Sequence, residues 1–125
     1  MSSEELHSEA LHDVRAHLAP FSDLLEGFDR CLAGLAAVEG LGIAVGGSLA
    51  RGGVHSHSDL DFELKPPAGM SLDEVLAEAL RISGTLGRVL SSFPASHIGL
   101  PNLLVVFVDM DGSVIKADFM VLLDS

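Results

Sequence analysis

The chain has 125 residues, a length that fits one domain with a compact core. Its 18 acidic and 7 basic residues give a formal net charge of −11, which excludes the clustered Lys and Arg that a long nucleic acid requires. Hydrophobic residues make up 48% of the chain, but the longest apolar run, 103–108, is far shorter than the roughly 20 residues that span a bilayer. The acidic start of the chain does not resemble a secretory signal. We therefore expect a cytoplasmic protein outside the membrane, whose apolar excess serves a partner surface.

Helices are predicted at the start of the chain. Apolar residues recur at helical spacing over 6–18, and Pro20 ends this first run. A second apolar stripe follows over 23–38, with Gly40 in the place of a C-cap. This stripe contains the single cysteine, Cys31, which excludes an internal disulfide and predicts a buried thiol.

Two strands are predicted next. An apolar strand over 41–45 ends at a Gly-Gly pair, and residues 48–51 have the character of a first helical turn. A second strand over 60–65 alternates apolar residues with Asp61 and Glu63, as a strand with one buried face does.

A helix is predicted after the second strand. Ser71 and Glu74 match a capping box, and the helix that they start is expected to reach about Leu90. Pro94 and Pro101 then bracket an expected loop.

A β-hairpin is predicted at the end of the chain, with strands over 103–108 and 114–123 joined by a Met-Asp-Gly turn. The order of elements predicts an α/β (α+β) fold, in which a mixed sheet of about four to five strands has helices packed on one face. We expect one domain, 1–125, with a helical segment over 1–40 and a core over 41–123.

The most specific motif lies between the first two strands. Gly46 and Gly47 let the backbone turn sharply and approach a ligand closely. Ser48 follows at an expected helix start, where free N–H groups, the helix dipole and the serine hydroxyl suit a phosphate. Taken alone, a Gly-Gly-Ser turn is a weak signal, and an ordinary strand-to-helix turn explains it as well.

Three aspartates strengthen the prediction of a site that binds phosphate and metal. Asp59 and Asp61 stand at positions i and i+2 near a strand, on one face, where they repel each other unless a cation lies between them. Mg²⁺ is bound by one or two carboxylates together with substrate phosphate oxygens. Asp118 lies in an apolar strand, where a carboxylate is costly without a partner or a metal, although an edge-strand aspartate that faces water is the alternative. As a general base it could activate an acceptor hydroxyl, and the three carboxylates could hold two Mg²⁺ ions.

This pattern resembles the nucleotidyltransferase superfamily typified by DNA polymerase beta, which has Gly-Ser or Gly-Gly-Ser, a spacer of this length, Asp-x-Asp and a later third Asp. The matching residues are Gly47, Ser48, Asp59, Asp61 and Asp118. Arg51 and Gly52 also match the longer Gly-Ser-x-Ala-Arg-Gly form of minimal nucleotidyltransferases. The resemblance covers about residues 41–123, which would then be the catalytic core.

The resemblance implies transfer of a nucleoside monophosphate, expected to be AMP from ATP, to a hydroxyl acceptor, with Mg²⁺ and release of pyrophosphate. It assigns nucleotide binding to the phosphate loop: Gly46, Gly47, Ser48 and Arg51. It assigns catalysis and metal binding to the carboxylates: Asp59, Asp61 and Asp118. Asp118 would activate the acceptor. A helix-surface salt bridge explains Arg51 equally well.

The sequence does not identify the acceptor of the nucleoside monophosphate. Minimal nucleotidyltransferases of this kind often act as antitoxins that modify a partner protein, and a small, acidic, apolar-rich chain fits such a partner or a homo-oligomer. An antibiotic-type enzyme acting on aminoglycosides or lincosamides is one alternative, because an acidic site attracts cations. The helical domain that builds the acceptor site of such enzymes is missing from this sequence, so a minimal enzyme or a shortened form of a larger one is expected. A non-catalytic partner subunit that keeps the fold is the other alternative.

Overall fold

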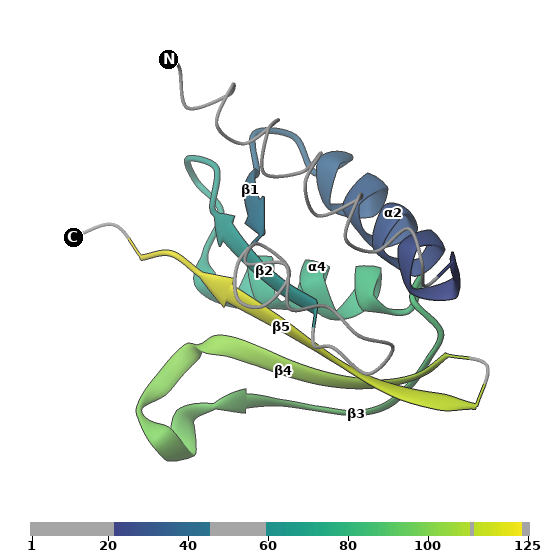
Figure 1. Cartoon of the computed structure of the whole chain (residues 1–125). Helices are drawn as coiled ribbons and strands as arrows, with labels where there is room; N and C mark the ends of the chain where they lie inside the picture. The colour runs from purple at the N-terminus through teal and green to yellow at the C-terminus, as the bar shows by residue number, and fades with distance from the viewer. Residues whose placement is uncertain (1–21, 46–59, 111, 124–125) are drawn as a thin grey trace.

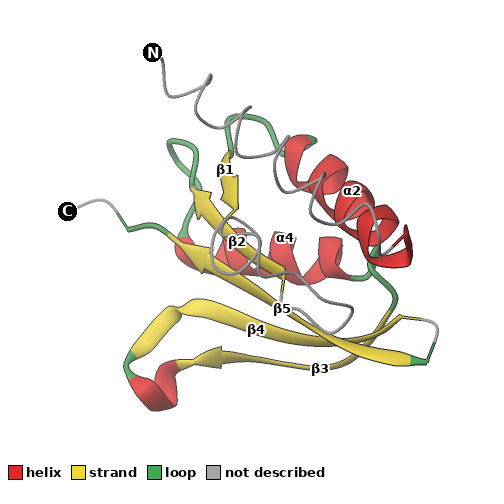
Figure 2. Cartoon of the chain, in the orientation of Figure 1, coloured by secondary structure: helices red, strands yellow, loops and turns green. Residues whose placement is uncertain are grey.

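Alternating apolar residues in the strands build a mixed sheet, against which α-helices pack (Figures 1 and 2). The computed structural model describes residues 22–45, 60–110 and 112–123. The elements in these ranges, in chain order, are α2 (Ser22–Ala36), β1 (Gly42–Val45), β2 (Leu60–Lys65), α4 (Leu72–Ser83), β3 (Arg88–Ala95), η1 (Ser96–Ile98), β4 (Leu100–Met110) and β5 (Ser113–Val121).

The described strands form one five-stranded sheet with the order β1-β2-β5-β4-β3. β2 and β5 are parallel, and the other neighbouring strands are antiparallel. Parallel neighbours need a crossover connection, and here α4 and the β3–β4 pair lie in the chain between them (Figure 2). The crossover brings residues 60–64 alongside residues 117–121, which lie far away in the sequence.

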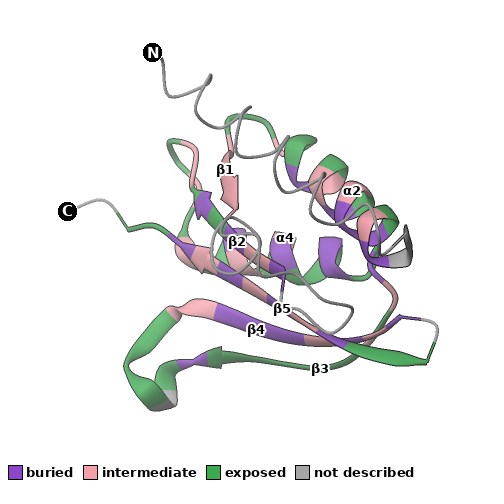
Figure 3. Ribbon diagram, in the orientation of Figure 1, coloured by how far each residue is buried: buried purple, intermediate pink, exposed green. Residues whose placement is uncertain are grey.

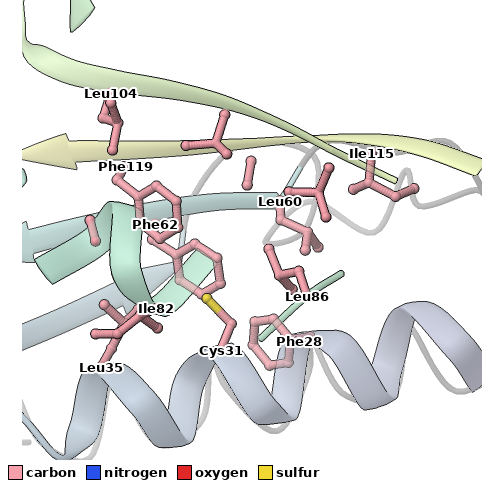
Figure 4. Close-up of a cluster of buried hydrophobic side chains, with 14 of the residues drawn as sticks. Phe28, Cys31, Leu35, Leu60, Phe62, Ile82, Leu86, Leu104, Ile115 and Phe119 are labelled. Atoms are coloured by element: carbon pink, nitrogen blue, oxygen red, sulfur yellow. The ribbon is translucent and has the colours of Figure 1, made fainter. Parts of the chain in front are cut away.

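One face of the sheet and the two described α-helices share an apolar core. At its centre the ring of Phe62 stacks on Phe28 at a centroid distance of 5.8 Å and on Phe119 at 5.3 Å (Figure 4). Cys31 points from α2 into this core and is fully buried, as predicted. Burial raises the pKa of its thiol from 9.0 to about 12. The expected arrangement, a mixed sheet of four to five strands with helices on one face, is confirmed for the described residues.

The capping box predicted before α4 is present. The Oγ atom of Ser71 accepts a hydrogen bond from the Glu74 backbone N–H, and Glu74 Oε1 accepts one from the Ser71 N–H, both at 3.2 Å. These bonds satisfy donors that have no partner inside the helix and fix where it begins. The predicted helix over 23–38 and the strands over 41–45 and 60–65 also match α2, β1 and β2 within two residues.

The prediction that this helix reaches Leu90 is wrong. α4 ends at Ser83, and its place is taken by β3, which was expected to be helix and loop. Gly87 marks the change, because a Cβ there would clash with the carbonyl oxygen of Asp109 on β4. The register shift between Val89 and Ser91 hides the two-residue period of a strand.

The connection expected between the two prolines is present but shorter than predicted, since only η1 and Gly99 separate β3 from β4. Pro94 lies in β3 opposite Leu104, and Pro101 lies inside β4. β3 is an edge strand, where a residue without an N–H is tolerated because one side of the strand lacks a neighbouring strand.

The hairpin at the end of the chain is confirmed. β4 and β5 pair from Leu103–Met120 to Met110–Ser113, although β4 begins at Leu100. Gly112 adopts φ 92° in the turn, a conformation that favours glycine, and its N–H donates to Asp109 Oδ1 at 2.9 Å.

Two further predictions concern residues that the structure does not describe. The first expected helix, over 6–18, and the helical turn at 48–51 lie outside the described ranges. None of the helices in the described part of the chain is both long enough and apolar enough to cross a membrane.

Candidate active site

The face of the sheet opposite the helices carries the acidic residues. Along β2, Leu60, Phe62 and Leu64 are buried toward the helices, so Asp61 and Glu63 point to the opposite face. Along β5 the same alternation places Asp118 between the buried residues 117 and 119. We call this side the uncovered face, because neither described α-helix packs on it.

Two of the predicted site residues lie next to each other on the uncovered face. The parallel register pairs Asp61 of β2 with Asp118 of β5. Adjacent strands are about 4.8 Å apart, so these two carboxylates share one small region although 56 positions separate them in the sequence. Two like charges at this separation repel each other, which a bound cation would relieve.

Asp118 is held by a lysine on its own strand. Lys116 lies two residues earlier, hence on the same face, and its Nζ atom is 3.2 Å from Asp118 Oδ2. The Asp118 side chain is only 17% exposed. Its other oxygen, Oδ1, is buried and makes no hydrogen bond with the part of the chain that the structure describes. A buried carboxylate oxygen without a partner is costly, so this atom is suited to receive a proton or bind a cation.

β1 ends close to the Asp61–Asp118 pair. Val45, the last residue of β1, pairs with Phe62, and Phe62 follows Asp61 directly. The strand therefore ends one register position from the carboxylate pair, on the side of β2 opposite to β5.

The remaining predicted site residues lie outside the described ranges, in segment 46–59: Gly46, Gly47, Ser48, Arg51 and Asp59. Their roles in the site therefore stay predictions. The structure brings together two of the three predicted aspartates and adds Lys116, which sequence reasoning missed. The signal for Lys116 was its i, i+2 spacing from Asp118 on one strand.

The described carboxylates fit part of a magnesium site. Within residues 22–45, 60–110 and 112–123, no group of three or more His, Cys, Asp and Glu side chains has the arrangement of a metal site. Mg²⁺ does not require such a cage, since one or two carboxylates with phosphate oxygens and water suffice. Asp61, Asp118 and the unpaired Oδ1 atom supply ligands of that kind.

The uncovered face changes from charged to apolar across β4 and β3. Asp118 pairs with Val105, which is 6% exposed, and Val105 pairs with Phe93. The rings of Phe93 and Phe107 are tilted against each other at a centroid distance of 6.3 Å. Figure 3 shows β3 as largely exposed. Sequence reasoning missed this aromatic pair because β3 was not recognised as a strand.

Comparisons with known proteins add no family to this picture: no model of a known protein family matches the chain, and no curated protein matches it.

Proposed function

We propose that the protein is a Mg²⁺-dependent nucleotidyltransferase that moves a nucleoside monophosphate, AMP from ATP, to a hydroxyl acceptor. The observation that carries this proposal is the in-register pairing of Asp61 and Asp118 on the uncovered face. Two like charges side by side repel each other, so their mutual interaction does not stabilise the fold. A reaction that handles a metal-bound triphosphate requires such a pair.

In the proposed reaction the acceptor oxygen attacks the α-phosphorus of ATP. The new bond joins the acceptor oxygen to that phosphorus, the bond from the phosphorus to the bridging oxygen breaks, and pyrophosphate leaves. Asp118 takes the proton of the acceptor hydroxyl, for which its buried Oδ1 atom is suited. Lys116 holds the other oxygen, Oδ2, and thereby orients the carboxylate.

Asp61, Asp118 and the predicted ligand Asp59 would hold Mg²⁺, which when bound neutralises phosphate charge. The phosphate loop that follows β1 would bind the triphosphate through Gly46, Gly47 and Ser48, with Arg51 balancing its charge. The end of β1 supports this assignment, because its last residue, Val45, pairs with Phe62, which directly follows Asp61.

The partners belong to the proposal as well. We propose a cytoplasmic enzyme that acts with a partner protein or as a homo-oligomer. Large apolar side chains are exposed at and near the β3–β4 connection, namely Phe93 at 38%, Ile98 at 63% and Leu100 at 36%. Exposed apolar groups that lie close together are typical of an interface. The same observation favours the second candidate function, a partner subunit without catalysis.

Thermal denaturation with ATP and Mg²⁺ tests the proposal. At an ATP concentration about 100-fold above Kd we expect a stabilisation of about 2.7 kcal/mol that requires Mg²⁺, together with pyrophosphate release when an acceptor is supplied. Asp61→Asn should abolish both effects and leave the fold intact. Glu63→Gln is the matched control, since Glu63 is an exposed carboxylate on the same strand and face.

Two results would count against the enzyme. Absence of both an ATP-dependent shift and pyrophosphate release would favour the partner subunit without catalysis. Equal losses in Asp61→Asn and Glu63→Gln would show that general acidity of the face, rather than the paired carboxylates, is responsible.

A further inference from the structure

We infer that Lys116 is a positioning residue that decides in what form Mg²⁺ enters the site. By occupying Asp118 it disfavours the free metal ion and favours the metal that arrives together with a triphosphate. The inference rests on the proposed function and adds a regulation of the same site. It goes beyond the orientation of the carboxylate, because Lys116 then has opposite effects on a cation and on an anionic nucleotide.

The ammonium group of Lys116 lies against a metal ligand of the proposed site. Its Nζ atom is 3.2 Å from Asp118 Oδ2, whereas Asp118 Oδ1 makes no hydrogen bond with the described part of the chain. A metal ion that binds Oδ2 has to share this oxygen with the ammonium group or displace it. Lys116 is therefore a cation that belongs to the protein and competes with the metal for Asp118.

The sheet holds the lysine in this place. Lys116 and Asp118 are two residues apart on β5, so both side chains point to the uncovered face. Phe107 of β4 is the direct partner of Lys116, and direct partners in a sheet point to the same face. The Lys116 side chain is only 36% exposed, so its stem lies along the protein and its charged end stays beside the carboxylate.

The charges of these side chains act in opposite directions on a cation and on an anion. Asp61 and Asp118 lie in adjacent register positions and carry two negative charges, of which Lys116 neutralises one. A positive charge beside the ligand repels a free divalent cation. ATP that carries one Mg²⁺ is still an anion, so the same positive charge attracts it. Lys116 therefore weakens binding of the metal alone and strengthens binding of the metal–nucleotide complex.

Two affinities of Lys116→Met test both directions. This variant keeps an unbranched apolar side chain and removes the charge. Mn²⁺, which binds to the same kind of oxygen ligands as Mg²⁺, is the metal probe, and EPR measures its free concentration. Because a unit charge a few ångströms away acts on the bound ion, we expect Mn²⁺ alone to bind about tenfold more tightly than in the wild type. ATP with one equivalent of Mg²⁺, measured by calorimetry, should bind about tenfold more weakly.

Lys65→Met is the matched control. Lys65 is an exposed lysine on the same face of β2, four residues and hence about 13 Å along the strand from Asp61. This distance exceeds the Debye length at physiological salt, so both affinities should equal those of the wild type within about twofold. Lys116→Arg, which keeps the charge, should also stay close to the wild type in both measurements.

The opposite directions distinguish this role from a purely structural one. A damaged fold would weaken binding of both ligands, and urea denaturation of Lys116→Met and Lys116→Gln identifies the variant that is folded. In that variant, Mn²⁺ binding that is unchanged or weaker would overturn the inference. Tighter binding of both Mn²⁺ and ATP would also overturn it, since Lys116 would then not favour the nucleotide.

The Mn²⁺ measurement separates failure of this inference from failure of the proposed function, because it needs no nucleotide. If the wild type binds no ATP but Lys116→Met binds Mn²⁺ more tightly, the competition at Asp118 stands and the transferase proposal fails. If ATP binds to the wild type with Mg²⁺ while Lys116→Met leaves Mn²⁺ binding unchanged, the inference fails and the transferase proposal stands.

Discussion

β2 and β5 carry two pairs of residues in adjacent register positions, one on each face of the sheet. On the covered face Phe62 and Phe119 stack with a centroid distance of 5.3 Å and an interplanar angle of 10°. On the uncovered face the preceding residue of each strand, Asp61 and Asp118, forms the neighbouring pair. The same two strand segments thus bring together an aromatic pair that favours folding and a like-charged pair that opposes it.

The two pairs differ in whether their contribution to the stability of the fold explains why they are present. Burial of aromatic rings accounts for the covered pair without reference to function. The acidic pair places two like charges side by side, and the ion pair between Lys116 and Asp118 is partly buried, with the two side chains 36% and 17% exposed. A role outside folding is the simplest reason for such a pair, and four measurements test whether the two faces differ in this way.

The largest effect is expected on the covered face. Phe62→Ala removes the central ring of the Phe28–Phe62–Phe119 stack and should lower the free energy of unfolding by about 3–5 kcal/mol, as measured by urea denaturation. Phe93→Ala, on the uncovered face, should cost about 1 kcal/mol, because Phe93 is 38% exposed. Similar losses of unfolding free energy in the two variants would show that the two faces of the sheet do not differ in their contribution to stability.

The second effect is a pH dependence that arises from Cys31. Burial raises the pKa of its thiol in the folded protein from 9.0 to about 12, so between these values the unfolded chain binds fewer protons than the folded one. Stability therefore falls as pH rises above 9. From pH 8 to pH 10 the thiol should remove about 1.4 kcal/mol from the free energy of unfolding.

Cys31→Ala provides the reference for this measurement. Its overall stability will be lower, but its loss between the two pH values should be smaller than that of the wild type by the same 1.4 kcal/mol or so. Parallel pH profiles for the two proteins would mean that water reaches the thiol and that the core beneath Phe62 is open.

The third effect concerns the helix that helps to cover the apolar face. Ser71→Ala removes the hydrogen bond to the Glu74 N–H and should cost about 1 kcal/mol in the same denaturation experiment. Ser92→Ala, at an exposed position of β3, should change stability by less than about 0.5 kcal/mol. If the two serine variants agree, the capping box does not hold α4 in place.

Sequence reasoning recovered the elements whose signals are local. The alternation of Leu60, Phe62 and Leu64 with polar residues predicted β2, and the Ser71–Glu74 capping box predicted the start of α4. In both cases the physical cause lies within a few neighbouring residues, so the sequence contains it.

β3 could not be recovered in this way. Residues up to Leu90 read as a helical continuation, because the register shift at Val89/Ser91 breaks the alternation and the strand gains its order from pairing with β4. The uncovered face depends on the same pairing. Asp118 was selected because an acid in an apolar strand is unusual, but its position beside Asp61 follows from the crossover, and the aromatic pair follows from β3.

The smallest expected change in stability is the most informative about function. Asp118→Asn replaces the carboxylate by a group of the same shape, relieves repulsion with Asp61 and leaves Lys116 able to donate to the amide oxygen. We expect the free energy of unfolding to change by less than about 1 kcal/mol in metal-free buffer, with any change upward and smaller at high salt. Glu63→Gln, at an exposed position of β2, should have no effect. A loss of about 3 kcal/mol or more in Asp118→Asn would make Asp118 a structural residue, as a buried ion pair that loses one partner would be. A neutral effect on stability, joined to loss of the Mg²⁺-dependent ATP shift, would instead assign the acidic pair to function, because a residue that folding does not need and ligand binding does need belongs to the site.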